Sequence, residues 1–293
     1  MSRQSAGLER LARIMLIDAH QHFWRLDRGD YGWLTPDLEG LYRDYLPADL
    51  GPELLACGID GTILVQAAPA DGETDFLLRL AQNSPVIHGV VGWAALDGDH
   101  PEPRIEALAG CPKFKGLRPM IQDIVDPDWM LSARAGRGFS AMVNSGLRLD
   151  GLVRAGQIAQ LSLLADRYPK LPIVLNHAGK PDIVGGQLQG WSADIQDLAR
   201  RPNVACKLSG LLTEAGPHSR DDDLAPYVDR LLESFGPSRL MWGSDWPVLR
   251  LAGEYQTWHA QARHMLAALS ADEQALIFGG VATAFYGLET TRS

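Results

Sequence analysis

Histidines and carboxylates stand where apolar strands of this chain are expected to end. The first predicted strand begins at Leu16 and leads to His20 and His22, one residue apart. Because side chains alternate along a strand, the two imidazoles and Asp18 share one side. Two neutral imidazoles can hold one divalent metal such as zinc, although most such pairs have ordinary structural roles. The pair therefore predicts a metal site only if further ligands join it.

Two further candidates lie far along the chain. His177 and Asp245 each follow a hydrophobic run. Asp245 is predicted to be a metal ligand, the general base that activates water, or both in turn, because a nearby cation keeps a carboxylate ionised and acidifies water. Each residue alone has a plainer interpretation, a hydrogen-bonded histidine or an aspartate that caps a turn. Their combination with the histidine pair predicts one site built from four residues.

Other polar and aromatic side chains complete the predicted site. Arg118 and Lys207 are candidates for binding negative charge. A planar guanidinium can donate two parallel hydrogen bonds to a carboxylate, and an ammonium group carries a compact positive charge. Either residue could instead lie with its stem over apolar surface. The tryptophans are candidates for a wall against a substrate ring, and ordinary packing is an equal alternative. The predicted substrate contacts are Arg118, Lys207, Gln66, Trp33, Trp93 and Trp246.

The elements that must position these residues repeat a simple pattern. About eight apolar runs alternate with helix-length segments, which predicts a (β/α)8 TIM barrel with the site at the carboxyl ends of its strands. A doubly wound open sheet is the alternative, but the chain has no obvious glycine-rich phosphate loop. Residues 16–293 are predicted to form a single barrel domain, and residues 1–15 a frayed extension. After the first strand, the predicted strands are 61–66, 86–93, 114–119, 146–150, 172–177, 203–209 and 239–245.

Composition limits the partners of this chain. A net charge of −9 over 293 residues argues against a nucleic-acid partner, which would require a basic face. Cys57, Cys111 and Cys206 are too few and too widely spaced for a disulfide framework, which favours a cytoplasmic location. No apolar run is long enough to cross a membrane. A small-molecule substrate is the expected partner, and the sequence leaves the oligomeric state open.

Five motifs carry a family resemblance over about residues 16–288. In order along the chain they resemble the amidohydrolase-related family of metal-dependent hydrolases, and within it most closely the sugar lactonases of the L-fuconolactonase and L-rhamnono-lactonase type. The motifs are Asp-Ala-His-Gln-His-Phe-Trp from Asp18, Lys-Gly-Leu-Arg-Pro from Lys115, Asn-His-Ala-Gly-Lys-Pro from Asn176, Cys-Lys-Leu-Ser-Gly-Leu from Cys206 and Met-Trp-Gly-Ser-Asp-Trp-Pro from Met241.

The resemblance implies a distorted TIM barrel in which His20, His22, His177 and Asp245 surround one divalent metal, with zinc the expected ion, or a vestige of such a site. Two metals are not expected, because no strand-end histidine follows His177. Some lactonases of this type work without a metal, which leaves the metal requirement open. Asp245 is the implied base.

The predicted reaction is hydrolysis of a sugar-acid lactone to the open aldonate. Water attacks the ring carbonyl, and Arg118 or a histidine stabilises the oxyanion. The predicted catalytic residues are Asp245, His177 and Arg118. One alternative is a decarboxylase or an aromatic-pathway lactonase, which would grip an anionic ring with several basic residues at the mouth of the barrel. Another is a barrel that binds a sugar acid without converting it.

Overall fold

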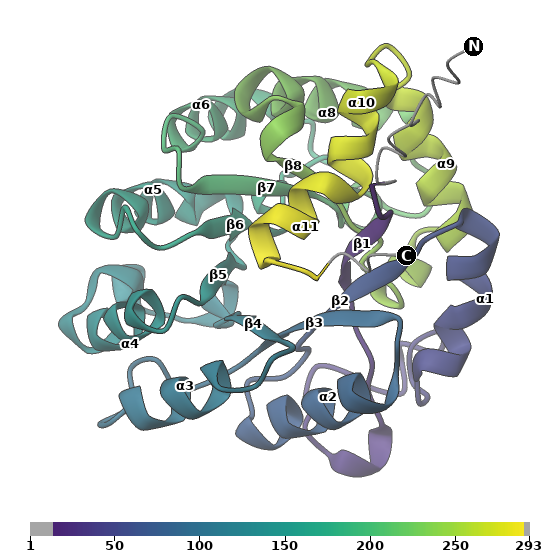
Figure 1. The fold of residues 1–293 in the computed structure, drawn as a ribbon. Coiled ribbons are helices and arrows are strands. Elements are labelled where there is room, and N and C mark those ends of the chain that lie inside the picture. The colour runs from purple at the N-terminus through teal and green to yellow at the C-terminus, as the bar shows by residue number, and fades with distance from the viewer. Residues whose placement is uncertain (1–13, 290–293) are drawn as a thin grey trace, which may run out of the picture.

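The computed structural model describes residues 14–289 and shows a barrel of parallel strands surrounded by helices (Figure 1). Eight strands are hydrogen bonded in chain order from β1 to β8, each parallel to the next. The strands are β1 (Ile17–Gln21), β2 (Gly61–Val65), β3 (Ile87–Gly92), β4 (Phe114–Leu117), β5 (Arg148–Gly151), β6 (Ile173–Leu175), β7 (Val204–Leu208) and β8 (Leu240–Trp242). Each overlaps its predicted run, which confirms the predicted (β/α)8 fold.

Eleven α-helices occur in the described part of the chain, most of them in the connections between strands. They are α1 (Pro47–Cys57), α2 (Asp71–Asn83), α3 (Glu102–Ala109), α4 (Ala133–Asn144), α5 (Ile158–Arg167), α6 (Leu188–Leu198), α7 (Leu211–Ala215), α8 (Asp221–Phe235), α9 (Tyr255–Met265), α10 (Ala271–Ala275) and α11 (Val281–Tyr286). The sequence predicts one closing helix from Ala271 to Phe285, whereas the structure divides this stretch by a π-helical segment, Leu276–Gly280. A Cβ atom at Gly279 would clash with the carbonyl oxygen of Met15, so the glycine allows this segment to pack closely against the chain before β1.

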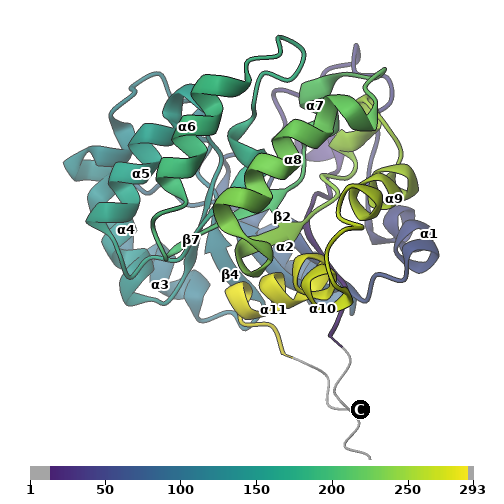
Figure 2. The ribbon, with the colours of Figure 1, turned by 90° about the horizontal axis from the view of Figure 1, so that it is seen from above.

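The barrel has two different ends. Figure 2 shows α10 and α11 at one end and α7 at the opposite end. Residues of α11, among them Ala282 and Tyr286, pack with inward-facing side chains of the strands such as Ile63 and Val91 in one apolar cluster. The amino-terminal end of the barrel is therefore closed by helix, and the strand ends that carry the predicted site face the other way.

The sheet closes where its first and last strands meet. The backbone N–H of His22 donates to the Trp246 carbonyl at 2.7 Å, and the N–H of Asp245 donates to the His20 carbonyl at 2.8 Å. A Cβ atom at Gly243 would lie 2.8 Å from the Cβ of His20, so only glycine permits this approach. The closing contacts thus bring the first and last predicted site motifs side by side.

Several expectations concern the chain ends and the cysteines. The predicted frayed extension lies, as far as residue 13, outside the described residues, and so do residues 290–293. Between residues 14 and 289, no helix is long and apolar enough to cross a membrane. All three cysteines lie within this range and are free, as expected.

Helix α4 runs without a break through Gly136 and Gly138, where the sequence predicts an interruption. Gly138 is buried, and a Cβ atom there would lie 2.5 Å from the backbone oxygen of Leu96. The glycine therefore serves close packing of α4 on the loop that follows β3.

We predict that Gly138→Ala lowers the free energy of unfolding by about 1–3 kcal/mol, because the added methyl group displaces backbone rather than a flexible side chain. Gly190→Ala in α6 is the matched control, since a Cβ there has no atom within 4 Å. Urea denaturation compares the two variants. An unchanged free energy of unfolding for Gly138→Ala would contradict the packing described.

Candidate active site

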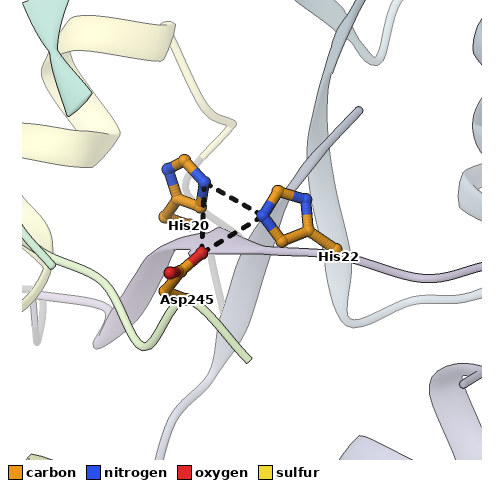
Figure 3. A group of neighbouring side chains, drawn as sticks. All are labelled: His20, His22 and Asp245. Carbon is orange, nitrogen blue, oxygen red and sulfur yellow. Dashed lines mark hydrogen bonds and ion pairs between the residues drawn. The ribbon is translucent and has the colours of Figure 1, made fainter. Parts of the chain in front are cut away.

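His20 of β1, His22 just after β1 and Asp245 after β8 converge at the carboxyl ends of the strands (Figure 3). The Nε2 atoms of His20 and His22 are 3.2 Å apart, and Asp245 Oδ1 lies 3.2 Å from His22 Nε2 and 3.7 Å from His20 Nε2. All three residues are buried. Ligand atoms that share one tetrahedral zinc at its usual bond lengths are separated by about 3.4 Å. The spacing of these three groups therefore fits a single metal ion.

His177 approaches the same carboxylate from β6. Its Nε2 lies 3.8 Å from Asp245 Oδ1, and its ring centroid is 4.4 Å from that of His20. The four residues His177 to Lys180 all have left-handed backbone angles, with φ between 51° and 72°, which non-glycine residues rarely adopt. The indole N–H of Trp191 donates to the Ala178 carbonyl at 2.7 Å and holds this turn. The turn directs the His177 ring inward.

The outer nitrogens of two histidines have partners that suit metal binding. His22 Nδ1 lies 2.8 Å from the Val65 carbonyl, which can only accept, so Nδ1 carries the hydrogen and Nε2 keeps a free lone pair. His177 Nδ1 lies 2.9 Å from the Ser209 hydroxyl, which can accept in the same way. Such partners orient metal-binding histidines in proteins. His20 differs, because its Nδ1 lies 3.2 Å from the amine of Lys207.

The protonation states of the site follow from burial and charge. Burial alone would raise the pKa of Asp245, but His177 and His22 together outweigh it and lower the pKa to about 2. Burial lowers the pKa of His177 to about 3 and also lowers the pKa of His22. At neutral pH the site therefore presents one carboxylate among neutral imidazoles, which is the protonation state that metal binding requires.

Asp18 holds the ends of β1 and β8 together beneath the site. Its carboxylate accepts the Ser244 N–H at 2.9 Å, the Ser244 hydroxyl at 2.6 Å and the Tyr255 hydroxyl at 3.0 Å. It also accepts the N–H of His20 at 3.1 Å. Because Asp245 directly follows Ser244 and has a positive φ of 61°, this network fixes the direction in which Asp245 leaves the strand.

A cavity of about 270 Å³ opens above these groups. The predicted residues that line it are His22, His177, Asp245, Arg118 and Trp33, whereas His20 does not line it. The lining side chains that the sequence did not single out come from loops that follow the strands. They are Ala67, Met120, Gln122, Asp123, Leu152, Lys180 and Val248.

Arg118 is a buried cation in the wall of this cavity. Its guanidinium donates to the carbonyl of Gln66, and the Gln66 amide donates to the Arg118 carbonyl at 2.7 Å. The Nε atom of Arg118 has no hydrogen-bond partner, and no carboxylate within residues 14–289 forms an ion pair with this side chain. Such a guanidinium is free to bind a negatively charged or polarised oxygen of a ligand.

Four of the predicted substrate contacts lie elsewhere. Gln66 is fully buried and positions Arg118. Lys207 is fully buried inside the barrel, where Asp150 pairs with it at 2.5 Å. Trp246 packs its ring against Phe23 and Tyr45, and Trp93 lines a neighbouring groove. None of these four side chains lines the cavity beside Asp245, so their role in substrate binding stays a prediction. Position at a strand end does not reveal whether a side chain points inward or toward the cavity.

Lys180 and Gln122 are the most informative of the side chains that sequence reasoning missed. Lys180 belongs to the same motif as His177 and reaches the cavity because the left-handed turn reverses the chain. Gln122 and Asp123 lie in a short 3₁₀ helix, Ile121–Asp123, shortly after β4. Following each strand end a few residues into its loop would have included them.

Comparison with known proteins decides the family. A family model described as amidohydrolase matches residues 17–288. The chain belongs to the amidohydrolase family. It is 42% identical to the L-fucono-1,5-lactonase of Burkholderia ambifaria, with 93% of this chain and 96% of that protein aligned. It is 37% identical to the L-fucono-1,5-lactonase of Burkholderia multivorans, over 93% of this chain and 96% of that one.

A solved structure supports the same relationship. An amidohydrolase from Burkholderia multivorans crystallised with bound zinc superposes with a TM-score of 0.89, at 37% identity, and covers 94% of this chain and 100% of that one. The family resemblance inferred from five sequence motifs is therefore confirmed.

We predict that Asp18→Asn lowers the free energy of unfolding by about 3 kcal/mol, because an amide cannot accept all four hydrogen bonds and leaves buried donors unpaired. Tyr255→Phe, which removes only one donor to Asp18, is expected to lower it by about half as much. Urea denaturation of both variants makes the comparison, and equal effects would show that Asp18 does not hold the two strand ends.

Proposed function

We propose that this protein hydrolyses the ester bond of a sugar-acid lactone, such as L-fucono-1,5-lactone, to give the open aldonate. The observation that carries the proposal is a buried carboxylate, Asp245, facing a cavity whose wall holds the unpaired cation Arg118. A base and an oxyanion partner around one small cavity are what acyl transfer to water requires. The curated relatives bear out the sequence-based prediction of a sugar lactonase.

In the proposed reaction, Asp245 takes a proton from water, and the water oxygen attacks the ring carbonyl carbon. A carboxylate with a pKa of about 2 is a weak base toward ordinary water. A divalent metal, when bound by the histidines and Asp245, would supply a Lewis acid that makes water a stronger acid. We propose zinc, because two imidazole nitrogens and a carboxylate oxygen at this spacing suit it and a relative binds it.

Arg118 and His177 complete the proposed chemistry. The carbonyl oxygen gains negative charge as water adds, and the guanidinium of Arg118 binds this oxygen. Collapse of the tetrahedral intermediate breaks the bond to the ring oxygen, which leaves as an alcohol with the proton that Asp245 took from water. His177, neutral at neutral pH because burial lowers its pKa to about 3, places its Nε2 atom 3.8 Å from Asp245 Oδ1, where it would hold the metal together with that carboxylate.

The charge of the cavity favours a neutral ring as substrate. The charged residues that line it are two cations, Arg118 and Lys180, and two carboxylates, Asp123 and Asp245. A decarboxylase or an aromatic-pathway lactonase would need several basic residues to bind an anionic ring. Two cations matched by two carboxylates do not provide such a site. Gln122, Asp123 and Lys180 offer hydrogen-bond donors and acceptors that suit the hydroxyl groups of a sugar acid.

We predict that the purified protein releases acid from L-fucono-1,5-lactone in a pH-indicator assay, and that Asp245→Asn lowers kcat/KM by at least about 10³-fold because the amide cannot take a proton. Asp222→Asn, an exposed change at the start of α8, serves as the control and should match the wild type. Full activity of Asp245→Asn would eliminate the assigned base, and tight aldonate binding without turnover would favour a binding protein.

Arg118→Met tests the oxyanion role. We expect kcat to fall by about 10²–10³-fold with little change in KM, because the lost interaction strengthens as charge develops. Steady-state kinetics on the same lactone give both constants, and a melting curve shows whether the variant folds. A large rise in KM at constant kcat would instead assign Arg118 to binding of the ground state.

A further inference from the structure

Glu73 is a fully buried carboxylate beside the loop that follows β2. It lies in the first turn of α2, and its two oxygens accept the backbone N–H groups of Ala67 at 2.8 Å and of Ala68 at 2.9 Å. Both alanines are buried, so without the carboxylate these N–H groups would have no water to bind. Glu73 therefore fixes the loop at the point where the chain leaves the sheet.

The same loop holds an aromatic side chain in the wall of the cavity. The indole N–H of Trp33 donates to the Ala67 carbonyl at 2.8 Å, and the Trp33 ring meets Trp24 edge to face with centroids 5.5 Å apart. Trp33 lines the cavity and is 38% exposed. Because the carbonyl occupies the only donor of the indole, the ring offers a ligand an apolar surface.

The carbonyl that holds Trp33 belongs to the same peptide unit as one of the N–H groups that Glu73 binds. The C=O of Ala67 and the N–H of Ala68 lie in one plane and point in opposite directions, because the peptide bond between them is planar and trans. Glu73 accepts on the N–H side, and Trp33 donates on the C=O side. The carboxylate thus sets the direction of the carbonyl, and the carbonyl sets the position of the indole.

We propose that Glu73 is a positioning residue for substrate binding, which holds the Trp33 ring through the Ala67–Ala68 peptide as an apolar platform for one face of the lactone ring. Glu73 itself does not line the cavity, so its effect on the substrate passes through Trp33. The C–H groups on a face of the sugar ring suit an aromatic surface, and its hydroxyl groups suit the polar side chains of the wall. The inference rests on the proposed function, because it takes a sugar lactone as the ligand of the cavity.

Steady-state kinetics on L-fucono-1,5-lactone test the link in a double-mutant cycle. We expect Trp33→Ala to raise KM by about threefold to tenfold and to change kcat by less than about twofold, because it removes only packing on the ring. Glu73→Gln is expected to raise KM as well, since an amide has one oxygen for two N–H donors. The double variant is expected to have the KM of Trp33→Ala alone. Effects on KM that multiply in the double variant would overturn the proposal.

A second variant and a matched control accompany the cycle. Glu73→Asp keeps both oxygens on a shorter side chain and is expected to raise KM in the same direction. Glu273→Gln is the control, because Glu273 accepts the Ser270 N–H at 2.9 Å at the start of α10, at the opposite end of the barrel (Figure 2). Its KM should match the wild type, and a melting curve shows whether each variant folds. Wild-type KM in both Glu73 variants would contradict the proposed role.

Nitrogen NMR of protein labelled with ¹⁵N-tryptophan tests the link without substrate, and so separates its failure from failure of the proposed function. Trp33→Phe identifies the indole signal of Trp33. We expect Glu73→Gln or Glu73→Asp to shift this signal and to speed exchange of its hydrogen with water. The indole signal of Trp191, whose N–H binds the Ala178 carbonyl, should stay in place. An unchanged Trp33 signal in a folded Glu73 variant would overturn the proposal.

Discussion

Closure of the sheet between β1 and β8 is the constraint on which the site depends. Backbone hydrogen bonds join His22 to Trp246 and Asp245 to His20, so closing the barrel places groups 223 residues apart in direct contact. Gly243 permits the close approach, and Asp18 satisfies the buried donors of the last strand end. Fold and site are therefore formed by the same contacts, and disturbance of one disturbs the other.

The chemistry of the site follows from how its charges are paired. Asp245 is surrounded by neutral imidazoles, and Arg118 has no carboxylate partner in the part of the chain that the structure describes. Buried ionised groups without full pairing are costly to the fold and are typical of functional sites. Lys207 and Asp150 show the opposite case, because they form a fully buried ion pair with each other inside the barrel.

Much of this architecture could be predicted from the sequence, and the limits have physical causes. The alternation of apolar runs with helical segments identified the barrel, and strand ends identified the histidines and Asp245. The direction of side chains beyond a strand end depends on loop geometry, as the left-handed turn that brings Lys180 to the cavity shows. Likewise, only the packed structure reveals that Lys207 pairs inward and that Trp246 packs on aromatic neighbours.

A crystal structure with a bound aldonate product, or with a slowly hydrolysed lactone analogue, tests the central claim most directly. The account predicts that the carboxyl or ring carbonyl carbon lies next to Asp245, with its oxygen bound by Arg118 and the sugar hydroxyls near Gln122 and Lys180. A ligand bound with its hydroxyl groups at Asp245 and its carbonyl directed out of the cavity would contradict the account.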